Sequence, residues 1–125
     1  MIRVKRVYEE ASRDDGKRVL VDRVWPRGVS RDKLCLDEWM KDIAPSTGLR
    51  KWFGHRRERW GEFARRYEEE LRAPGHAGQL RRLADWARAG TLTLLYSARD
   101  EECNQAVVLV AVLVRDYESK RQGRK

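Results

Sequence analysis

The sequence predicts a single α/β domain built on a small, mainly parallel sheet flanked by helices. Two observations support this fold class. The segment Thr91–Ser97 is almost continuously apolar, which is typical of a strand buried on both sides in a parallel sheet. Amphipathic stretches separate it from two apolar strands expected near the N-terminus, and this order of elements indicates an α/β fold. At 125 residues the chain has the usual size of one domain.

Two strands are expected at the start of the chain. Ile2–Tyr8 alternates apolar and basic residues, which is the period of a strand with one buried face. The polar cluster Ser12–Gly16 has the composition of a tight turn. Val19–Trp25 is expected to form the second strand, and it leads into an arginine-bearing turn with the rigid neighbours Pro26 and Gly28.

Two helices are expected in the next part of the chain. Four apolar residues within Leu36–Ile43 recur at helical spacing, so they are expected to share one face of a helix that Ala44–Pro45 ends. Ser46 then suits the N-cap of a short helix, and Gly54 suits its C-terminal stop.

Three longer helices complete the predicted fold. Glu58–Leu71 has the clearest amphipathic stripe, and Leu80–Ala87 forms a further helix that Gly90 closes. The last helix is expected from about Glu101 to Tyr117. Its run Ala106–Val114 is rich in β-branched residues, but burial overrides weak intrinsic propensity.

The domain is expected to span residues 1–115, and residues 116–125 are expected to form a basic, disordered tail. Basic residues outnumber acidic ones by 28 to 20 along the chain, which gives a formal charge of +8. This balance favours an anionic partner such as nucleic acid or phosphate. An arginine-rich solvated surface is the alternative interpretation.

The two cysteines indicate a reducing compartment. Cys35 and Cys103 lie far apart, without the spacing of a zinc site, and the chain does not open with a signal peptide. The longest apolar run is far shorter than the roughly 18 residues of a membrane span. We therefore expect a cytoplasmic protein that does not contact membranes. With two histidines and no carboxylate cluster at ligand spacing, neither a metal nor a cofactor is expected.

The end of the second strand is the first candidate ligand site. Ligands of α/β proteins bind outside the carboxyl ends of the strands, and Arg23 and Arg27 lie at or just past this end. The strand that ends near Ser97 leads into a helix, whose free N–H groups favour an anion. Guanidinium groups grip phosphate or carboxylate oxygens through two parallel hydrogen bonds. We therefore expect a basic pocket for an anionic small molecule. Further candidates for this pocket are Lys41, Ser46 and Arg50.

A structural role for the same arginines is the alternative. In that interpretation Arg23 and Arg27 form internal salt bridges with Asp22, Asp42 or Glu70 and hold the turn in place. The sequence contains neither GxGxxG nor GxxxxGK[ST], and the absence of a phosphate loop argues against nucleotide binding.

Nucleophilic chemistry is the second candidate. Cys103 is expected in the first turn of the last helix, where the helix dipole lowers a thiol pKa. A cysteine-based phosphatase needs an arginine six positions further on, which neither Cys103 nor Cys35 has. A small buried residue is therefore the preferred interpretation of Cys103. His55 follows a predicted helix end, where it serves either as a cap or as an acid, base or anion ligand.

Tryptophans raise the prospect of base stacking in a nucleic-acid complex. Three of the five, Trp39, Trp52 and Trp60, fall on apolar helical stripes and are expected in the core. Trp25 is the exception, because it stands beside Pro26 and Arg27 at a strand end, where it can stack on a planar ligand or on the arginine.

Together these segments resemble the YeaO-like family of bacterial domains of unknown function. The resemblance rests on R-V-W-P-R-G at 23–28, W-M-K-D-I-A-P-S at 39–46, L-R-K-W-F-G-H at 49–55, W-G-E-F-A-R-R-Y-E-E-E-L at 60–71 and T-L-L-Y-S-A-R-D-E-E-C-N-Q-A at 93–106. It implies a small cytosolic α/β domain with no established activity. The family's marked polar positions fall on Arg23, Arg27, Lys41, Ser46, Arg50, His55 and Asn104. Together with Ser97, these are the eight residues expected to line the anion pocket.

Two functional hypotheses follow. The first is a basic pocket that binds a phosphate- or carboxylate-bearing small molecule, with or without a reaction. The second is a nucleic-acid-binding or regulatory module that uses the net positive charge and the basic tail.

Overall fold

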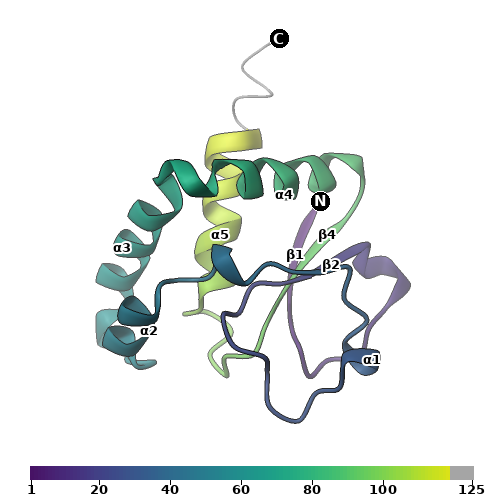
Figure 1. The fold of residues 1–125 in the computed structure, drawn as a ribbon, viewed down its shortest axis with the longest axis horizontal. Helices are drawn as coiled ribbons and strands as arrows, with labels where there is room; N and C mark the ends of the chain where they lie inside the picture. The colour runs from purple at the N-terminus through teal and green to yellow at the C-terminus, as the bar shows by residue number, and fades with distance from the viewer. Residues whose placement is uncertain (119–125) are drawn as a thin grey trace.

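The computed structural model describes residues 1–118 and has a four-stranded, all-parallel sheet at its centre (Figure 1). The strands are β1 (Ile2–Arg6), β2 (Lys17–Leu20), β3 (Glu38–Trp39) and β4 (Leu92–Tyr96), arranged in the order β1-β4-β2-β3. The helices are α1 (Arg31–Leu34), α2 (Thr47–Phe53), α3 (Trp60–Arg72), α4 (Ala77–Ala89) and α5 (Gln105–Leu113). Short 3₁₀ turns cover Arg13–Asp15, Lys41–Ile43, Arg57–Arg59 and Pro74–His76, and a π-helical turn covers Val114–Glu118. The predicted α/β class is confirmed.

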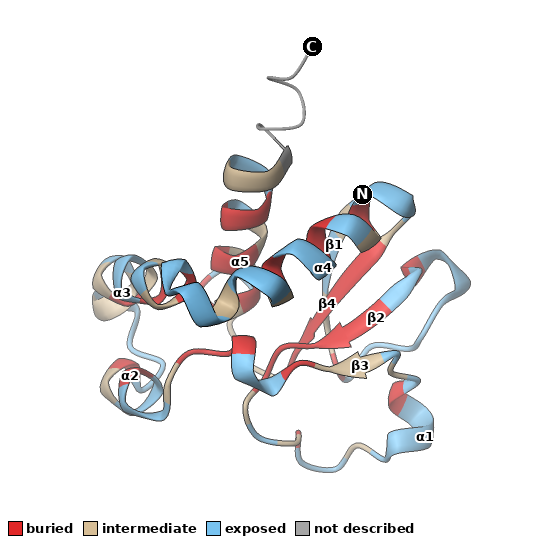
Figure 2. Ribbon diagram, turned by 45° about the horizontal axis from the view of Figure 1, so that its top comes forward, coloured by how far each residue is buried: buried red, intermediate tan, exposed pale blue. Residues whose placement is uncertain are grey.

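Strand β4 is the central element of the sheet. It pairs with β1 on one side and β2 on the other, and all five of its residues are buried (Figure 2). Leu92, Leu94 and Tyr96 face the helical layer, whereas Leu95 faces the opposite side. The continuous apolar run of this strand follows from having both faces covered. Figure 1 shows α3, α4 and α5 gathered on one side of the sheet and α1 on the other.

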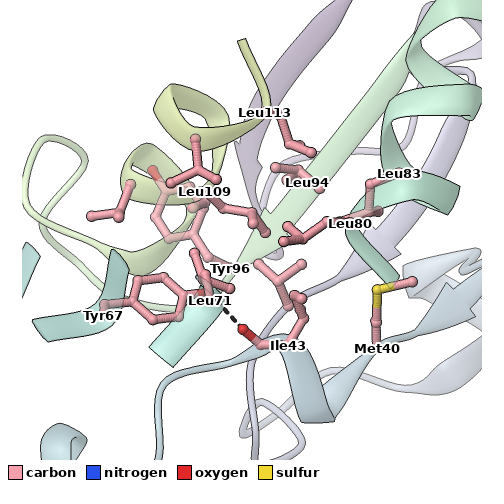
Figure 3. Close-up of a cluster of buried hydrophobic side chains, with 14 of the residues drawn as sticks. Met40, Ile43, Tyr67, Leu71, Leu80, Leu83, Leu94, Tyr96, Leu109 and Leu113 are labelled. Atoms are coloured by element: carbon pink, nitrogen blue, oxygen red, sulfur yellow. Dashed lines mark hydrogen bonds between the residues drawn. The ribbon is translucent and has the colours of Figure 1, made fainter. Parts of the chain in front are cut away.

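The main core lies between the sheet and helices α2 to α5 (Figure 3). The predicted amphipathic helices α3 and α4 supply buried residues at the expected spacing. Tyr67 is fully buried, and its hydroxyl donates to the Ile43 carbonyl at 2.7 Å, which satisfies the one polar atom of this side chain. Phe53 stacks on Phe63 with ring centroids 4.3 Å apart, so the short helix α2 is fixed against α3.

The helix expected over Leu36–Ile43 is wrong. The segment forms strand β3 and then a 3₁₀ turn, because Met40 N–H donates to the Leu20 carbonyl at 2.9 Å and joins the segment to β2. Leu36 and Trp39 pack on one side of the sheet, and Met40 and Ile43 pack on the other. The four apolar residues therefore divide between two cores rather than forming one stripe.

Two element boundaries also differ from the prediction. Strand β2 ends at Leu20, so the Val21–Trp25 part of the expected strand lies beyond it. Helix α5 begins at Gln105 with Asn104 as its N-cap, so Cys103 precedes the helix. The chain continues in a π-helical turn to Glu118, and the rest of the expected basic tail, residues 119–125, lies outside the described residues. Among residues 1–118, no helix is both long and apolar enough to cross a membrane.

A buried ion cluster ties the start of β2 to its neighbours. Asp15 has no exposed surface, and its carboxylate accepts hydrogen bonds from Arg18, Lys5 and the Ser12 amide. Arg18 is 4% exposed and also donates twice to the Leu34 carbonyl, at 2.8 and 3.0 Å. Burial raises the pKa of Asp15, but the hydrogen bonds from Ser12, Lys5 and Arg18 outweigh this and hold it below its ordinary value.

We predict that Asp15→Asn destabilises the protein by about 3 kcal/mol, because it leaves the buried Arg18 guanidinium without its counterion. Urea denaturation measures the difference. The exposed neighbour Asp14, substituted as Asp14→Asn, is the control and is expected to change stability by less than about 0.5 kcal/mol. Because the folded-state pKa of Asp15 is lowered, its contribution is present above the ordinary value of 3.8 and is lost as the pH falls through the folded-state value. An equal effect of the two substitutions near pH 7 would contradict this role.

Candidate functional site

A cavity of about 770 Å³ opens at the carboxyl ends of β1, β2 and β4. The chain segments after these three strands and residues of α2 form its wall. Since β4 inserts between β1 and β2 in the sheet, segments that are distant in sequence meet here. The cavity therefore lies where α/β proteins hold their ligands.

Six of the eight predicted pocket residues line this cavity. These six are Arg23, Arg27, Arg50, His55, Ser97 and Asn104. Lys41 and Ser46 lie elsewhere. The Lys41 ammonium is 5.1 Å from the centroid of the Trp39 ring. Ser46 caps α2, and its amide and hydroxyl donate to Glu70 at 2.8 and 2.6 Å, so this residue joins α2 to α3.

Arg23 is held by the protein itself. Its guanidinium donates to the Pro45 carbonyl at 3.0 Å and to the Ala44 carbonyl at 2.9 Å. The expected structural alternative was a salt bridge to an acidic residue, but the partners are backbone carbonyls. Arg23 thus connects the segment after β2 to the segment before α2 through hydrogen bonds, and it forms part of the cavity wall.

Asp22 also lines the cavity, and because this residue is only 7% exposed, its position defines the inner end of the cavity. One oxygen, Oδ2, accepts from the Ser97 amide at 3.1 Å and from the Ser97 hydroxyl. The other oxygen, Oδ1, accepts from Gln105 Nε2 at 2.6 Å. Burial raises the pKa of Asp22, while the hydrogen bonds from Ser97 and Gln105 and the positive charge of Arg50 partly offset this.

Several of the donors expected to bind an anion near Ser97 already have partners within the protein. Asp22 takes the Ser97 amide and hydroxyl, and Asp100 accepts the amides of Glu102 and Cys103, both at 3.0 Å. At the start of α5, the Asn104 side chain accepts from Val107 N–H and donates to the Asp100 carbonyl. Ser97, Glu102, Cys103 and Asn104 therefore make their hydrogen bonds within the protein, and completion of the anion site by the first amides of α5 stays a prediction.

Several cations of the cavity have no such partner. Within residues 1–118, the side chains of Arg27, Arg50, Lys51 and Arg99 make no hydrogen bond or ion pair, and all four residues are exposed. His55 lies beside them, directly after the Gly54 stop of α2, with its ring 6.2 Å from that of Phe53. The positive charge of the site is thus at its exposed rim.

Cys103 also lines the cavity, but it is poorly suited to act as a nucleophile. It is 8% exposed and lies before α5. The lowering of the thiol pKa that was predicted for a position in the first turn of the helix is therefore absent. Burial and the charge of Asp100 raise the pKa of this thiol, which lowers its thiolate fraction at neutral pH. The interpretation of Cys103 as a small buried residue agrees with this geometry.

The sequence interpretation did not include Asp22, Lys51, Arg99 or Gln105 among the pocket residues. For Asp22 a signal was present, because a lone acid follows the apolar run Val19–Val21 and has to find donors when buried. Gln105 and Arg99 have no comparable signal, since their place in the cavity depends on how β4 and β2 lie side by side.

The site and fold define a small α/β domain with an arginine-rimmed pocket at the carboxyl edge of its sheet. The family model described as the inactive DUF488-N3 subclade matches residues 1–125. The uncharacterised protein YeaO of Escherichia coli is 48% identical over 108 residues, which cover 86% of this chain and 92% of the relative. An uncharacterised protein of Mycobacterium tuberculosis is 43% identical over 112 residues, which cover 90% and 92% of the two chains. No solved structure gives a significant match. The chain therefore belongs to the YeaO-like family, as the sequence motifs predicted. Its matching family model is described as the inactive subclade.

We predict different stability effects for the two arginines of the 23–28 segment. Arg23→Ala removes two hydrogen bonds to buried carbonyls and is expected to lower the free energy of unfolding by about 1–3 kcal/mol. Arg27→Ala removes an exposed side chain without such bonds and is expected to change it by less than about 0.5 kcal/mol. Chemical denaturation of both variants tests this, and a larger loss for Arg27→Ala would contradict the assignment.

We also predict that Cys103 reacts slowly with iodoacetamide in the native protein. Its thiol is buried with a raised pKa, whereas Cys35 is exposed, so Cys35 is expected to be alkylated at least about tenfold faster. Peptide mass spectrometry after timed labelling at pH 8 separates the two sites, and labelling in denaturant is the control. Faster alkylation of Cys103 than of Cys35 would show an activated thiol and contradict the account.

Proposed function

We propose that this chain is a cytoplasmic binding module that holds a phosphate- or carboxylate-bearing small molecule in the cavity at the carboxyl ends of β1, β2 and β4. The observation that supports this most directly is the set of cations without protein partners at the cavity rim, Arg27, Arg50, Lys51 and Arg99. Like charges gathered around one cavity repel one another, and a bound anion replaces this repulsion with attraction.

The chemistry of these side chains suits an oxyanion. A guanidinium offers a planar fork of N–H donors that matches two oxygens of a phosphate or carboxylate, and an ammonium adds a point charge. Arg27 comes from the segment after β2, Arg50 from α2, and Arg99 from the segment after β4. An anion among them is therefore approached from three separate parts of the fold.

We propose binding without turnover. The description of the matched subclade as inactive supports this, as does the raised pKa of the buried Cys103 thiol. The buried acid of the cavity, Asp22, already accepts three hydrogen bonds from the protein, which favours a fixed recognition group over a mobile base.

Nucleic acid is the alternative partner, and the described surface favours it less. Outside the cavity, many arginines are neutralised by carboxylates of the same protein. These ion-paired arginines include Arg65, Arg66, Arg82, Arg88 and Arg115. A polyanion binds chiefly through cations without protein partners, so these ion-paired arginines are poor contacts for phosphates, although the net charge of +8, which already counts their carboxylate partners, still favours an anion. Residues 119–125 lie outside the described residues.

We predict that phenyl phosphate binds the wild-type protein and that Arg27→Ala or Arg50→Ala weakens its binding about tenfold or more. A lost hydrogen bond to a charged group is worth about 1.5–3 kcal/mol, and 1.4 kcal/mol corresponds to tenfold in Kd. Isothermal titration calorimetry at low salt measures the affinities. Arg81→Ala, on the exposed face of α4 and outside the cavity lining, is the matched control and should bind like the wild type.

Equal affinity of the wild type and both cavity variants would overturn the proposal, as would the absence of binding at low salt. Binding should weaken as salt is raised, because the rim cations are exposed and screened. No inorganic phosphate should be released from phenyl phosphate during prolonged incubation with the protein.

A further inference from the structure

Positive and negative side chains occupy different parts of the cavity, and this arrangement restricts the chemistry of the ligand further. Its cations, Arg27, Arg50, Lys51 and Arg99, belong to exposed residues at the rim, whereas the acid Asp22 is a buried residue, 7% exposed, at the inner end. A small inorganic anion satisfies the rim alone and is repelled by the acid behind it. A ligand that fills the cavity has to present an anion to the rim and a hydrogen-bond donor to the inner end.

The two carboxylate oxygens of Asp22 differ in how many further hydrogen bonds they can accept. Oδ2 accepts two hydrogen bonds from Ser97, from its amide and its hydroxyl. Oδ1 accepts a single hydrogen bond, from Gln105 Nε2 at 2.6 Å. A carboxylate oxygen has two lone pairs, so Oδ1 has room for one more donor. Since Asp22 lines the cavity, that donor can come from a ligand.

The size and walls of the cavity suit a ligand with a ring. A volume of about 770 Å³ lies within the usual range of small-molecule sites and far exceeds what one phosphate group occupies. Tyr8, Trp25 and Phe53 line it together with Pro26 and Pro45. Such aromatic and apolar walls pack against the flat or apolar faces of a sugar or a base.

We propose that the ligand is a phosphate monoester of a sugar or nucleoside, with its phosphate at the arginine rim and a hydroxyl or amino group donating to Asp22 Oδ1. This inference rests on the proposed function. It needs no glycine-rich loop, because the phosphate is held by arginine side chains and not by backbone amides. Asp22 then acts as a specificity residue that separates hydroxylated or aminated phosphates from simple ones.

The test compares four probes on the wild-type protein by isothermal titration calorimetry. Phenyl phosphate has the anion without a donor, ribose 5-phosphate and adenosine 5′-monophosphate have both, and adenosine has donors without the anion. At least one of the two donor-bearing phosphates should bind about tenfold more tightly than phenyl phosphate, because the latter offers no donor to the remaining lone pair of Asp22 Oδ1. Adenosine should bind much more weakly than either. The ratio between ribose 5-phosphate and adenosine 5′-monophosphate then separates a sugar from a nucleoside.

A substitution of the acid gives a second, independent comparison. In Asp22→Asn the remaining oxygen can still accept from Ser97, and the Gln105 amide can turn to accept from the new NH₂ group. The variant keeps these internal bonds but loses the oxygen offered to the ligand and its negative charge. It should bind the preferred donor-bearing phosphate about tenfold more weakly, while phenyl phosphate binds as well as before or better. Asp85→Asn, an exposed acid on α4 outside the cavity, should change neither.

The outcomes are separable. If phenyl phosphate and both donor-bearing phosphates bind the wild type equally, the inference about Asp22 is overturned while the proposed anion site stands. If no phosphate binds at low salt, both fail. An equal change in all affinities in Asp22→Asn would also overturn the specificity role. Should that variant not fold, the wild-type comparison alone still decides the question.

Discussion

The structure around the cavity depends on one buried acid. Asp22 follows strand β2, and its carboxylate binds Ser97, which follows β4, and Gln105, which begins α5. Its backbone carbonyl accepts from Trp39 Nε1 at 2.7 Å, which adds β3 to the same junction. A buried carboxylate is stable only when its oxygens are bonded, so this residue forces segments distant in sequence to meet at one point. The cavity opens beside that junction.

Charge is distributed in two ways in this molecule. The Asp15–Arg18 pair is buried and bonded on all sides, so it fixes the turn before β2 and has nothing to offer a ligand. At the other end of the sheet, Arg27 and Arg50 are exposed with no ion pair among residues 1–118. In a protein this rich in arginine, the cations that lack partners therefore indicate where an anion binds better than the net charge does.

The sequence predicted the elements whose signal is local. The all-buried β4, the amphipathic α3 and the capped α2 follow from hydrophobic period and from Ser46 and Gly54, and all three were found. Strand β3 was missed because Leu36, Trp39, Met40 and Ile43 happen to satisfy helical spacing, while hydrogen bonds to β2 decide the conformation. Pairing between strands is a tertiary property that a single-sequence pattern does not contain.

The same limit applies to the site. Arg23, Arg27 and Arg50 were recognised because they stand at the ends of predicted elements, and the cavity does bring them together. Whether an arginine is already bonded depends on backbone carbonyls such as those of Ala44 and Pro45, whose position only the fold determines. Likewise, the Ser97 amide and hydroxyl were expected to face a ligand, but they donate to the carboxylate of Asp22, which lies two residues after β2.

Amide chemical-shift mapping can show whether ligands enter the cavity at the carboxyl edge of the sheet. The ¹H–¹⁵N spectrum of the labelled protein is recorded during titration with ribose 5-phosphate at low salt. We expect saturable shifts concentrated in the segments after β1, β2 and β4 and at Arg50, with α4 unaffected. Shifts that centre on α4, or that spread over the surface without saturating, would contradict it.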